Sequence, residues 1–235
     1  MSLIEIKNLN KNYGRNQVIN DLSAEMGSGR IVGLLGPNGC GKSTLLKILA
    51  GLIADYSGEI RLDGHQPDIH TKSLVSYLPE RTYLSGWMRP VDAFDYFADF
   101  YGDFDRSKAD EMLRFFSLDP KQRIKTMSKG MQEKLQLTLV MSRRARIYLL
   151  DEPMGGVDPA ARSAILDVVL RNYQDDSLMV LATHLIYDVE RIFDEVLMMG
   201  YGQIIMQGET DQLRAQHGKS IDDIFREVFR CSVNL

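Results

Sequence analysis

The sequence predicts an α/β fold in which helices cover both faces of a mostly parallel β-sheet. Short apolar runs alternate with helical stretches along most of the chain, and this alternation is typical of parallel sheets. Residues 90–144 differ, because apolar side chains recur there at helical spacing with no strand between them. We therefore expect a separate helical lobe, inserted between two strands of the sheet.

The N-terminal elements have local signals. Isoleucines alternate with charged residues at positions 4–7, as in a half-buried strand. An apolar run at 31–35 predicts a strand that enters a glycine-rich turn. The next stretch, 42–50, carries leucines on one helical face and ends at Gly51, which is a common helix stop. Two more strands are expected before the helical lobe, at residues 58–62 and 74–78.

Strand signals return after the helical lobe. Apolar runs at 147–150 and 178–182 predict strands, and helices are expected after each of them, at 160–173 and 186–193. The last part of the chain predicts a hairpin and then helices, with strands at 196–199 and 203–206 and helices around Leu213 and residues 224–228.

Composition narrows the class of protein. The chain has 235 residues, which suits one domain with a large core or two small lobes that share a site. A net charge of −4 gives no basic excess, so we expect no nucleic-acid partner. Cys40 and Cys231 match no zinc or redox spacing, which favours a reducing compartment. With no signal peptide and no stretch near the ~18 apolar residues of a membrane span, we expect a cytosolic chain.

A phosphate-binding loop is the strongest motif. Residues 36–44 are Gly36, Pro37, Asn38, Gly39, Cys40, Gly41, Lys42, Ser43 and Thr44. This pattern lies between an expected strand and an expected helix. Glycines let successive N–H groups wrap an anion, and the positive end of the helix faces the same anion. Lys42 is expected to reach the β- and γ-phosphates of ATP, and Ser43 to offer a hydroxyl to Mg²⁺.

Two carboxylates end the strand expected at 147–150. Asp151 and Glu152 point to different sides because strand side chains alternate. We assign Asp151 to Mg²⁺ and Glu152 to the attacking water, as general base. An acidic pair alone is a weak signal, but the phosphate loop upstream makes the functional interpretation the stronger one.

The order of motifs resembles the nucleotide-binding cassette of ABC transporters over nearly the whole chain. Tyr77-Leu78-Pro79-Glu80 lies where the family has its glutamine loop, and residues 127–132 (Met-Ser-Lys-Gly-Met-Gln) where it has its signature. The resemblance implies a P-loop NTPase core with a mostly parallel sheet, an N-terminal antiparallel β portion and an inserted helical subdomain. It also implies one ABC ATPase domain over 1–235, in which 1–87 and 145–235 form the catalytic lobe and 88–144 the helical signature subdomain.

The resemblance also implies site residues and partners. Tyr13 would stack on adenine, Asp158 would belong to the D-loop, and His184 would be the switch histidine with a catalytic role. Ser128 and Gly130 would meet the γ-phosphate of ATP held by a second cassette, identical or different. Closure of the two cassettes around ATP would drive a multi-span membrane subunit, with this chain peripheral on the cytoplasmic face of the cell membrane.

Departures from the family pattern put turnover in question. Glu80 replaces a glutamine, which would place a carboxylate near Mg²⁺, and Lys129 and Met131 replace a glycine and a glutamine of the signature.

We also expect the position of Cys40, beside N–H groups and a helix N-terminus, to lower the pKa of its thiol.

The sequence leaves two other functions open. A soluble ABC ATPase of DNA repair or of the ribosome is one, although only about 50 residues separate Glu80 from the signature, with no heptads and no cysteine cluster. A nucleotide-sensing scaffold without turnover is the other. The intact Lys42, Asp151 and Glu152 argue against the scaffold.

Overall fold

A six-stranded, mostly parallel sheet forms the centre of the molecule. The computed structural model describes residues 2–174 and 176–230. The strand order is β5 (Val75–Leu78), β6 (Ile147–Asp151), β7 (Leu178–Thr183), β3 (Arg30–Leu35), β8 (Glu195–Gly200) and β9 (Gln203–Glu209). Neighbouring strands are parallel except β8 and β9, which form an antiparallel hairpin. The expected α/β class, parallel sheet and late hairpin are confirmed.

A second, antiparallel sheet has the order β2-β1-β4 and uses β1 (Ser2–Tyr13), β2 (Asn16–Gly27) and β4 (Ser57–Leu62). It confirms the expected N-terminal antiparallel portion, but the sequence pattern missed β2 and most of β1. Asn8 and Asp21 have positive φ angles of 49° and 48°, and the register of the β1–β2 pair shifts around them. The Asn8 side-chain amide donates to Asp21 Oδ1 at 2.8 Å. These irregularities interrupt the two-residue alternation by which strands are recognised.

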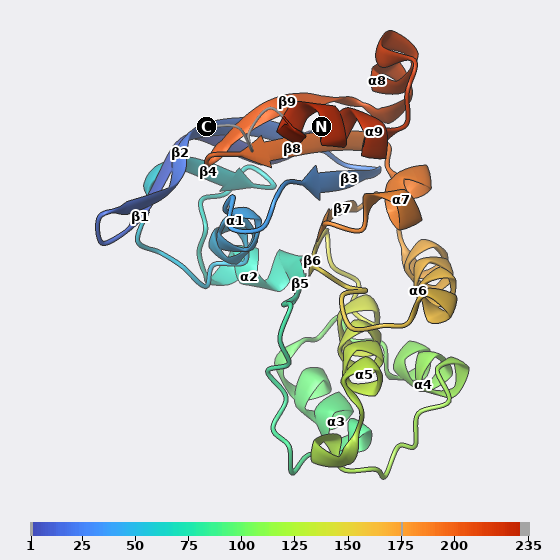
Figure 1. Cartoon of the computed structure of the whole chain (residues 1–235). Coiled ribbons are helices and arrows are strands. Elements are labelled where there is room, and N and C mark those ends of the chain that lie inside the picture. Colours follow the sequence, from blue (N-terminus) through green and yellow to red (C-terminus); the bar gives the residue numbers. More distant parts are fainter. Residues whose placement is uncertain (1, 175, 231–235) are drawn as a thin grey trace.

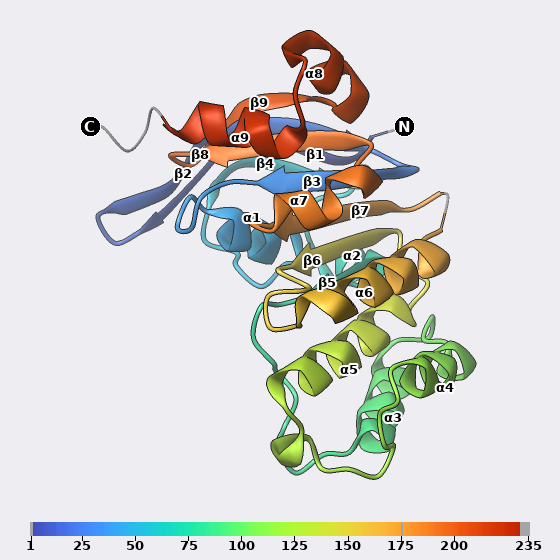
Figure 2. The same cartoon turned by 45° about the vertical axis from the view of Figure 1, so that its right-hand side comes forward.

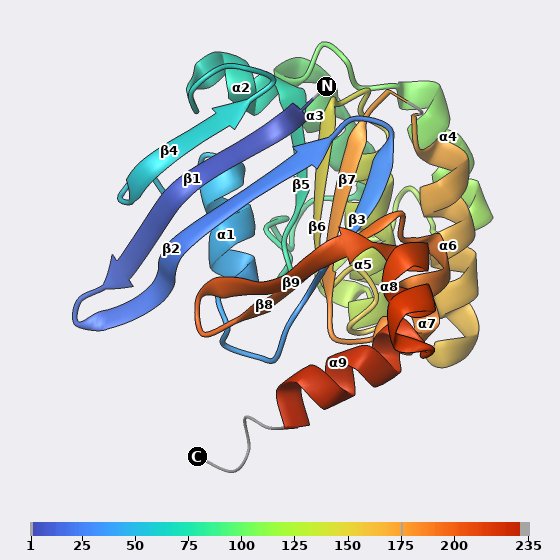
Figure 3. The same cartoon turned by 90° about the horizontal axis from the view of Figure 1, so that it is seen from above.

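Two apolar cores cover the two faces of the central sheet. Helix α1 (Lys42–Leu49) lies between the antiparallel sheet and one face of the central sheet (Figure 3). Its leucines pack there with Leu34 and Leu149. The next residues along the same strands, Leu35 and Leu150, point to the opposite core, which is shared with the helices. This alternation explains why both strands are continuous apolar runs.

The segment between β5 and β6 is helical, as expected. It contains α3 (Pro90–Phe100), α4 (Arg106–Phe115), a 3₁₀ turn (Ile124–Thr126) and α5 (Lys129–Met141). Figure 1 shows these helices together, on the far side of β5 and β6 from the antiparallel sheet. Arg143 joins them to the sheet: its side chain is 2% exposed, pairs with Asp103 at 3.0 Å and donates to the Val75 carbonyl at 2.6 Å.

The remaining helices complete the fold. They are α2 (Ile69–Leu74), α6 (Pro159–Asn172), α7 (Ile186–Val189) with a 3₁₀ turn (Glu190–Ile192), α8 (Thr210–His217) and α9 (Ile221–Arg230). Figure 2 shows α6 and α7 beside the central sheet and α8 and α9 beside the β8–β9 hairpin. Of these helices, the sequence pattern missed α2, a six-residue helix capped by Asp68 and Thr71. Among the described residues, no helix has both the length and the apolar character to span a membrane.

Candidate functional site: a nucleotide cleft

The phosphate loop connects the C-terminal end of β3 to the N-terminus of α1. Gly41 stands at the helix N-cap with φ of 109°, which favours glycine. Gly36 is required by space: a Cβ there would lie 2.3 Å from the Met199 carbonyl oxygen and 2.6 Å from Cys40 Sγ. The loop therefore packs closely against β8 at Gly36, while Asn38, Gly39 and Gly41 line the cleft.

Lys42 and Ser43 begin α1 and face the cleft. The Lys42 ammonium donates to the Gly36 and Pro37 carbonyls at 2.7 and 3.2 Å, so it is folded back over the loop. Ser43 Oγ donates to Asp151 Oδ1 at 3.0 Å. The hydroxyl and the carboxylate thus meet across the gap between the phosphate loop and the end of β6.

Asp151 is a buried carboxylate at the last position of β6, with 2% of its surface exposed. Burial raises the pKa of the Asp151 carboxyl; the Ser43 hydrogen bond opposes this rise, while the charges of Glu152 and Glu80 add to it. Because β6 is separated from β3 only by β7, the carboxylate and the phosphate loop share the C-terminal edge of the sheet. This edge is where open α/β sheets bind ligands.

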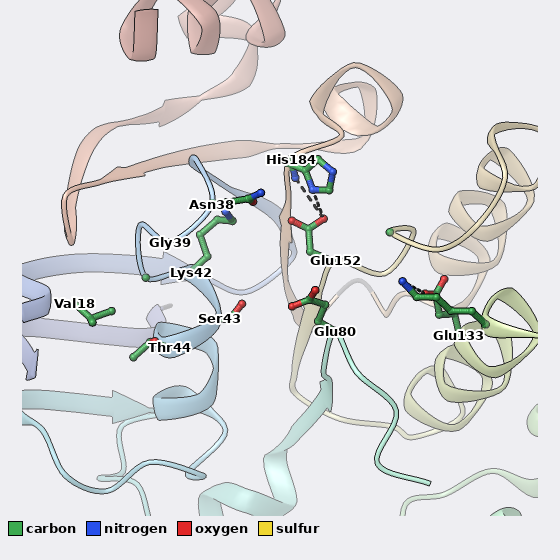
Figure 4. Close-up of a pocket in the computed structure, with 13 residues that line it drawn as sticks. Val18, Asn38, Gly39, Lys42, Ser43, Thr44, Glu80, Glu133, Glu152 and His184 are labelled. Carbon is green, nitrogen blue, oxygen red and sulfur yellow. Dashed lines mark hydrogen bonds and ion pairs between the residues drawn. The ribbon is translucent and has the colours of Figure 1, made fainter. Parts of the chain in front are cut away.

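Glu152 leaves the strand in a left-handed backbone conformation, with φ of 50°. Its carboxylate accepts from Thr183 Oγ1 at 3.1 Å and from the His184 backbone N–H at 3.4 Å, and it lies 2.9 Å from His184 Nδ1 (Figure 4). A carboxylate only accepts, so Nδ1 carries the proton in this contact. All three contacts use Oε2, and within the described part of the chain no hydrogen bond reaches Oε1. That oxygen is available to a water molecule.

Lys42, Ser43, Glu152 and His184 line one cleft of about 380 Å³, whereas the buried Asp151 is not among its lining residues, and neither are Gly36, Pro37 and Cys40. From the expected set the cleft brings together Asn38, Gly39, Gly41, Lys42, Ser43, Thr44, Glu80, Glu152 and His184. In Figure 4 the carboxylates of Glu80 and Glu152 lie on the same side of the gap, across from Lys42 and Ser43. The cleft therefore offers N–H groups and an ammonium on one wall and carboxylates on the other.

Some expected residues lie outside this cleft in the single chain. Tyr13 ends β1 and is half exposed, with the Lys11 ammonium 4.7 Å from the centre of its ring. Ser128 caps α5 by accepting from the Met131 N–H at 3.2 Å, and Gly130 follows in its first turn. Asp158 is exposed directly before α6. None of these four is among the residues that line the cleft.

Other cleft residues were not expected. Val18, Lys129, Glu133 and Gly155 also line it. Val18 lies on the missed strand β2, so the sequence pattern gave no reason to place it there. Lys129 and Glu133 belong to α5, and only the tertiary fold brings that helix to the cleft.

Cys40 departs from expectation. Its side chain is buried beneath the loop, beside the backbone of Gly36. Burial raises the pKa of the Cys40 thiol, and the nearby Lys42 charge and backbone N–H groups only partly offset this. The expected lowering of its pKa is wrong, because loss of hydration outweighs the positive surroundings.

A glycine-rich loop at the end of one parallel strand, with carboxylates at the end of a strand two places away in the sheet, is the arrangement of the P-loop nucleoside triphosphatases. Residues 19–155 match the model of the family described as ABC transporter. The chain belongs to this family.

Similar proteins agree with that assignment. The chain is 31% identical to YxlF of Bacillus subtilis, an uncharacterized ABC transporter ATP-binding protein, over 93% of this chain and 75% of that protein. It is 28% identical to the ABC-type transporter ATP-binding protein EcsA of the same organism, over 97% of each chain. A solved ATP-binding subunit of an ABC transporter superposes with a TM-score of 0.85 at 27% identity, covering 96% of this chain and 98% of that one. The protein is an ATP-binding, ATP-hydrolysing subunit of an ABC transporter.

Proposed function

We propose that the cleft binds MgATP and that Glu152 activates the water that attacks the γ-phosphate. The observation that carries this proposal is the Glu152–His184 contact at 2.9 Å, in the same cleft as Lys42 and Ser43. With Oε2 held by Thr183 and His184, Oε1 is the atom that orients the water and takes its proton. His184 keeps the carboxylate in this orientation.

The phosphate loop and Lys42 hold the nucleotide. The backbone N–H groups of Gly36 and of residues 38–44, together with the N-terminus of α1, surround the β-phosphate. The Lys42 ammonium leaves the loop carbonyls and moves to the β- and γ-phosphates. These carbonyl contacts suit a resting state, because they satisfy a cation that is 7% exposed until a phosphate oxygen replaces them.

The donor atoms fit Mg²⁺. Ser43 Oγ and the Asp151 carboxylate are hard oxygen donors 3.0 Å apart, and the Glu80 carboxylate lines the same cleft. The described residues contain no group of three or more His, Cys, Asp or Glu side chains placed to hold a metal. When bound, Mg²⁺ neutralises charge on the β- and γ-phosphates.

We further propose that two cassettes close around two ATP molecules. Ser128 and Gly130, at the N-terminus of α5, then face the γ-phosphate held by the partner cassette, and Asp158 lies at the same interface. The half-exposed ring of Tyr13 stacks on adenine. Such surfaces would be open in a single chain, and all four residues lie outside its cleft.

A multi-span membrane subunit is the proposed partner of this chain, which works at the cytoplasmic face of the membrane. An apolar hollow of about 510 Å³ between β5 and α3 supports this, with Tyr83, Tyr96 and Tyr101 in its lining. We assign the hollow to a helix of that subunit. The helical signature lobe is assigned to residues 88–144, and the catalytic lobe to 1–87 and 145–235.

The test uses Glu152→Gln. The variant should bind MgATP within about threefold of the wild-type affinity, while kcat for ATP falls at least 100-fold, as for loss of a general base. With MgATP it should accumulate as a dimer in size-exclusion chromatography with light scattering. Lys42→Ala is the matched control, because it should remain monomeric for want of bound ATP. Near wild-type turnover by Glu152→Gln would refute the role of Glu152.

A further inference from the structure

Glu133 connects α5, the helix that begins at the signature residues, to the loop that follows Glu152. It lies on α5, five residues after the N-cap Ser128, and its side chain is 13% exposed. Its Oε2 accepts a hydrogen bond from the Gly156 backbone N–H at 3.0 Å (Figure 4). Gly156 belongs to the loop of residues 152–158, which leads from Glu152 to α6.

The contact is built on a glycine. A Cβ at position 156 would lie 2.2 Å from Glu133 Oε1, so any side chain there would push the carboxylate away. The backbone of Gly130 also approaches this loop, since a Cβ on Gly130 would lie 3.6 Å from the Gly156 carbonyl oxygen. The distance at Gly130 is an ordinary van der Waals contact, so it is the absence of a side chain at position 156 that allows the Glu133 carboxylate to reach the loop.

The charge of Glu133 is balanced locally. Lys129, one turn earlier, places its ammonium 3.7 Å from Glu133 Oε1, although the Lys129 side chain is mostly exposed. Burial raises the pKa of the Glu133 carboxyl, while Lys129 and the Gly156 N–H counteract the rise. The hydrogen bond to Gly156 is the more specific of the two contacts, because an exposed ion pair at this distance is weak.

The loop that Glu133 holds begins with a strained residue. A non-glycine residue at φ of 50° is unfavourable and persists when its surroundings fix it. At its start the loop is fixed by the Glu152 N–H, which donates to the Ala182 carbonyl at 2.9 Å. In the middle it is fixed by Glu133. The two contacts fix the loop from the sheet and from the signature helix.

We propose that Glu133 is a positioning residue for ATP hydrolysis, which holds the 152–158 loop so that Glu152 meets its water when α5 is in place. This proposal rests on the proposed role of Glu152. The Glu133–Gly156 contact couples two parts of one chain, so that they move together. These parts are α5, which begins with Ser128 and Gly130, and the loop that carries Glu152.

The test measures ATP turnover and ATP binding by the full chain. Glu133→Ala should lower kcat about 10- to 100-fold, the range for a lost hydrogen bond to a charged group, with KM within about threefold of wild type. Glu133→Gln keeps an acceptor oxygen and should recover kcat to within about threefold. Glu111→Ala, at an exposed position of α4, is the control for removing a glutamate from the helical segment.

A double-mutant cycle gives the second measurement. Gly156→Ala should also lower kcat, because its Cβ separates the loop from Glu133. In the Glu133→Ala background the same change should cost nothing further, since the obstructing carboxylate is gone. Hydrogen exchange of a peptide covering 153–158 should be faster in Glu133→Ala and unchanged in Glu133→Gln.

Three outcomes would overturn the proposal: unchanged kcat in Glu133→Ala, a rise in KM with kcat preserved, or additive effects of the two substitutions. If Glu133→Ala does not fold, Glu133→Gln and Gly156→Ala still decide, since the first must retain turnover and the second must lose it. If Glu152→Gln loses turnover while Glu133→Ala keeps it, Glu152 retains its role and Glu133 does not.

Discussion

Replacing Gly36 with alanine should disrupt the phosphate loop where it packs against β8. The new Cβ would lie 2.3 Å from the carbonyl oxygen of Met199 in β8, and 2.6 Å from Cys40 Sγ. Real Cβ contacts essentially never fall under 3.0 Å, so the loop must move away from β8 by about 0.7 Å. The strand cannot move instead, because β8 is held by β3 and β9 on its two sides.

The magnitude follows from this overlap. Overpacking of a close-packed site costs about 1–3 kcal/mol. At roughly 2–4 °C per kcal/mol for a chain of this size, the melting temperature should fall by about 2–12 °C. Since a displacement near 1 Å at a reactive site costs on the order of 100-fold in rate, kcat/KM for ATP should fall at least tenfold.

Thermal unfolding and ATP turnover are the assays, with Gly218→Ala as the control. Gly218 ends α8 with φ of 64°, and a Cβ there has no neighbour within 4 Å among the described residues. That variant carries backbone strain of about 1 kcal/mol without overlap and should leave kcat/KM unchanged. Wild-type stability and turnover in Gly36→Ala would show that β8 does not constrain the loop.

Two further predictions concern Glu80 in the cleft and the buried thiol of Cys40. Glu80→Gln should tighten ATP binding in EDTA by about fivefold, the effect of one exposed charge near another, and should shrink the gain from Mg²⁺; equal Mg²⁺ gains in both proteins would show that Glu80 does not reach the metal. Because burial raises the pKa of Cys40, maleimide labelling of Cys40 should be slow at pH 7 and rise about tenfold per pH unit toward pH 9. Peptide mapping with Cys40→Ser as background measures this rate, and a plateau below pH 7.5 would contradict the raised pKa.

Regular elements with strong local signals were predictable from the sequence. Strands β3, β6 and β7 are continuous apolar runs because both faces of the sheet are covered, and their expected bounds agree with the structure to within a residue. Strand β2 was not predictable in this way. Its apolar residues Ile19 and Leu22 are three apart across the irregularity at Asp21, which breaks the alternation.

The candidate site divides along the same line. The phosphate loop and the Asp151–Glu152 pair are contiguous motifs, so their place at one sheet edge followed from the strand–loop–helix pattern. Glu133 has no such signal, because it is an ordinary helix residue until the fold brings Gly156 within 3.0 Å. Cys40 shows the reverse error: its neighbours in sequence suggested a reactive thiol, but its hydration depends on packing against Gly36, which the sequence does not reveal.

The position of β3 in the sheet has a consequence for synthesis of the chain. This strand ends at residue 35, yet its two hydrogen-bonded neighbours are β7 and β8, which begin at Leu178 and Glu195. During synthesis on the ribosome, neither neighbour of β3 exists until about three quarters of the chain has been made. Strands β1, β2 and β4 can pair long before that. Nascent chains that stop short of β7 should therefore contain a folded antiparallel sheet and an apolar strand with exposed edges, which is a substrate for chaperones and cannot bind ATP.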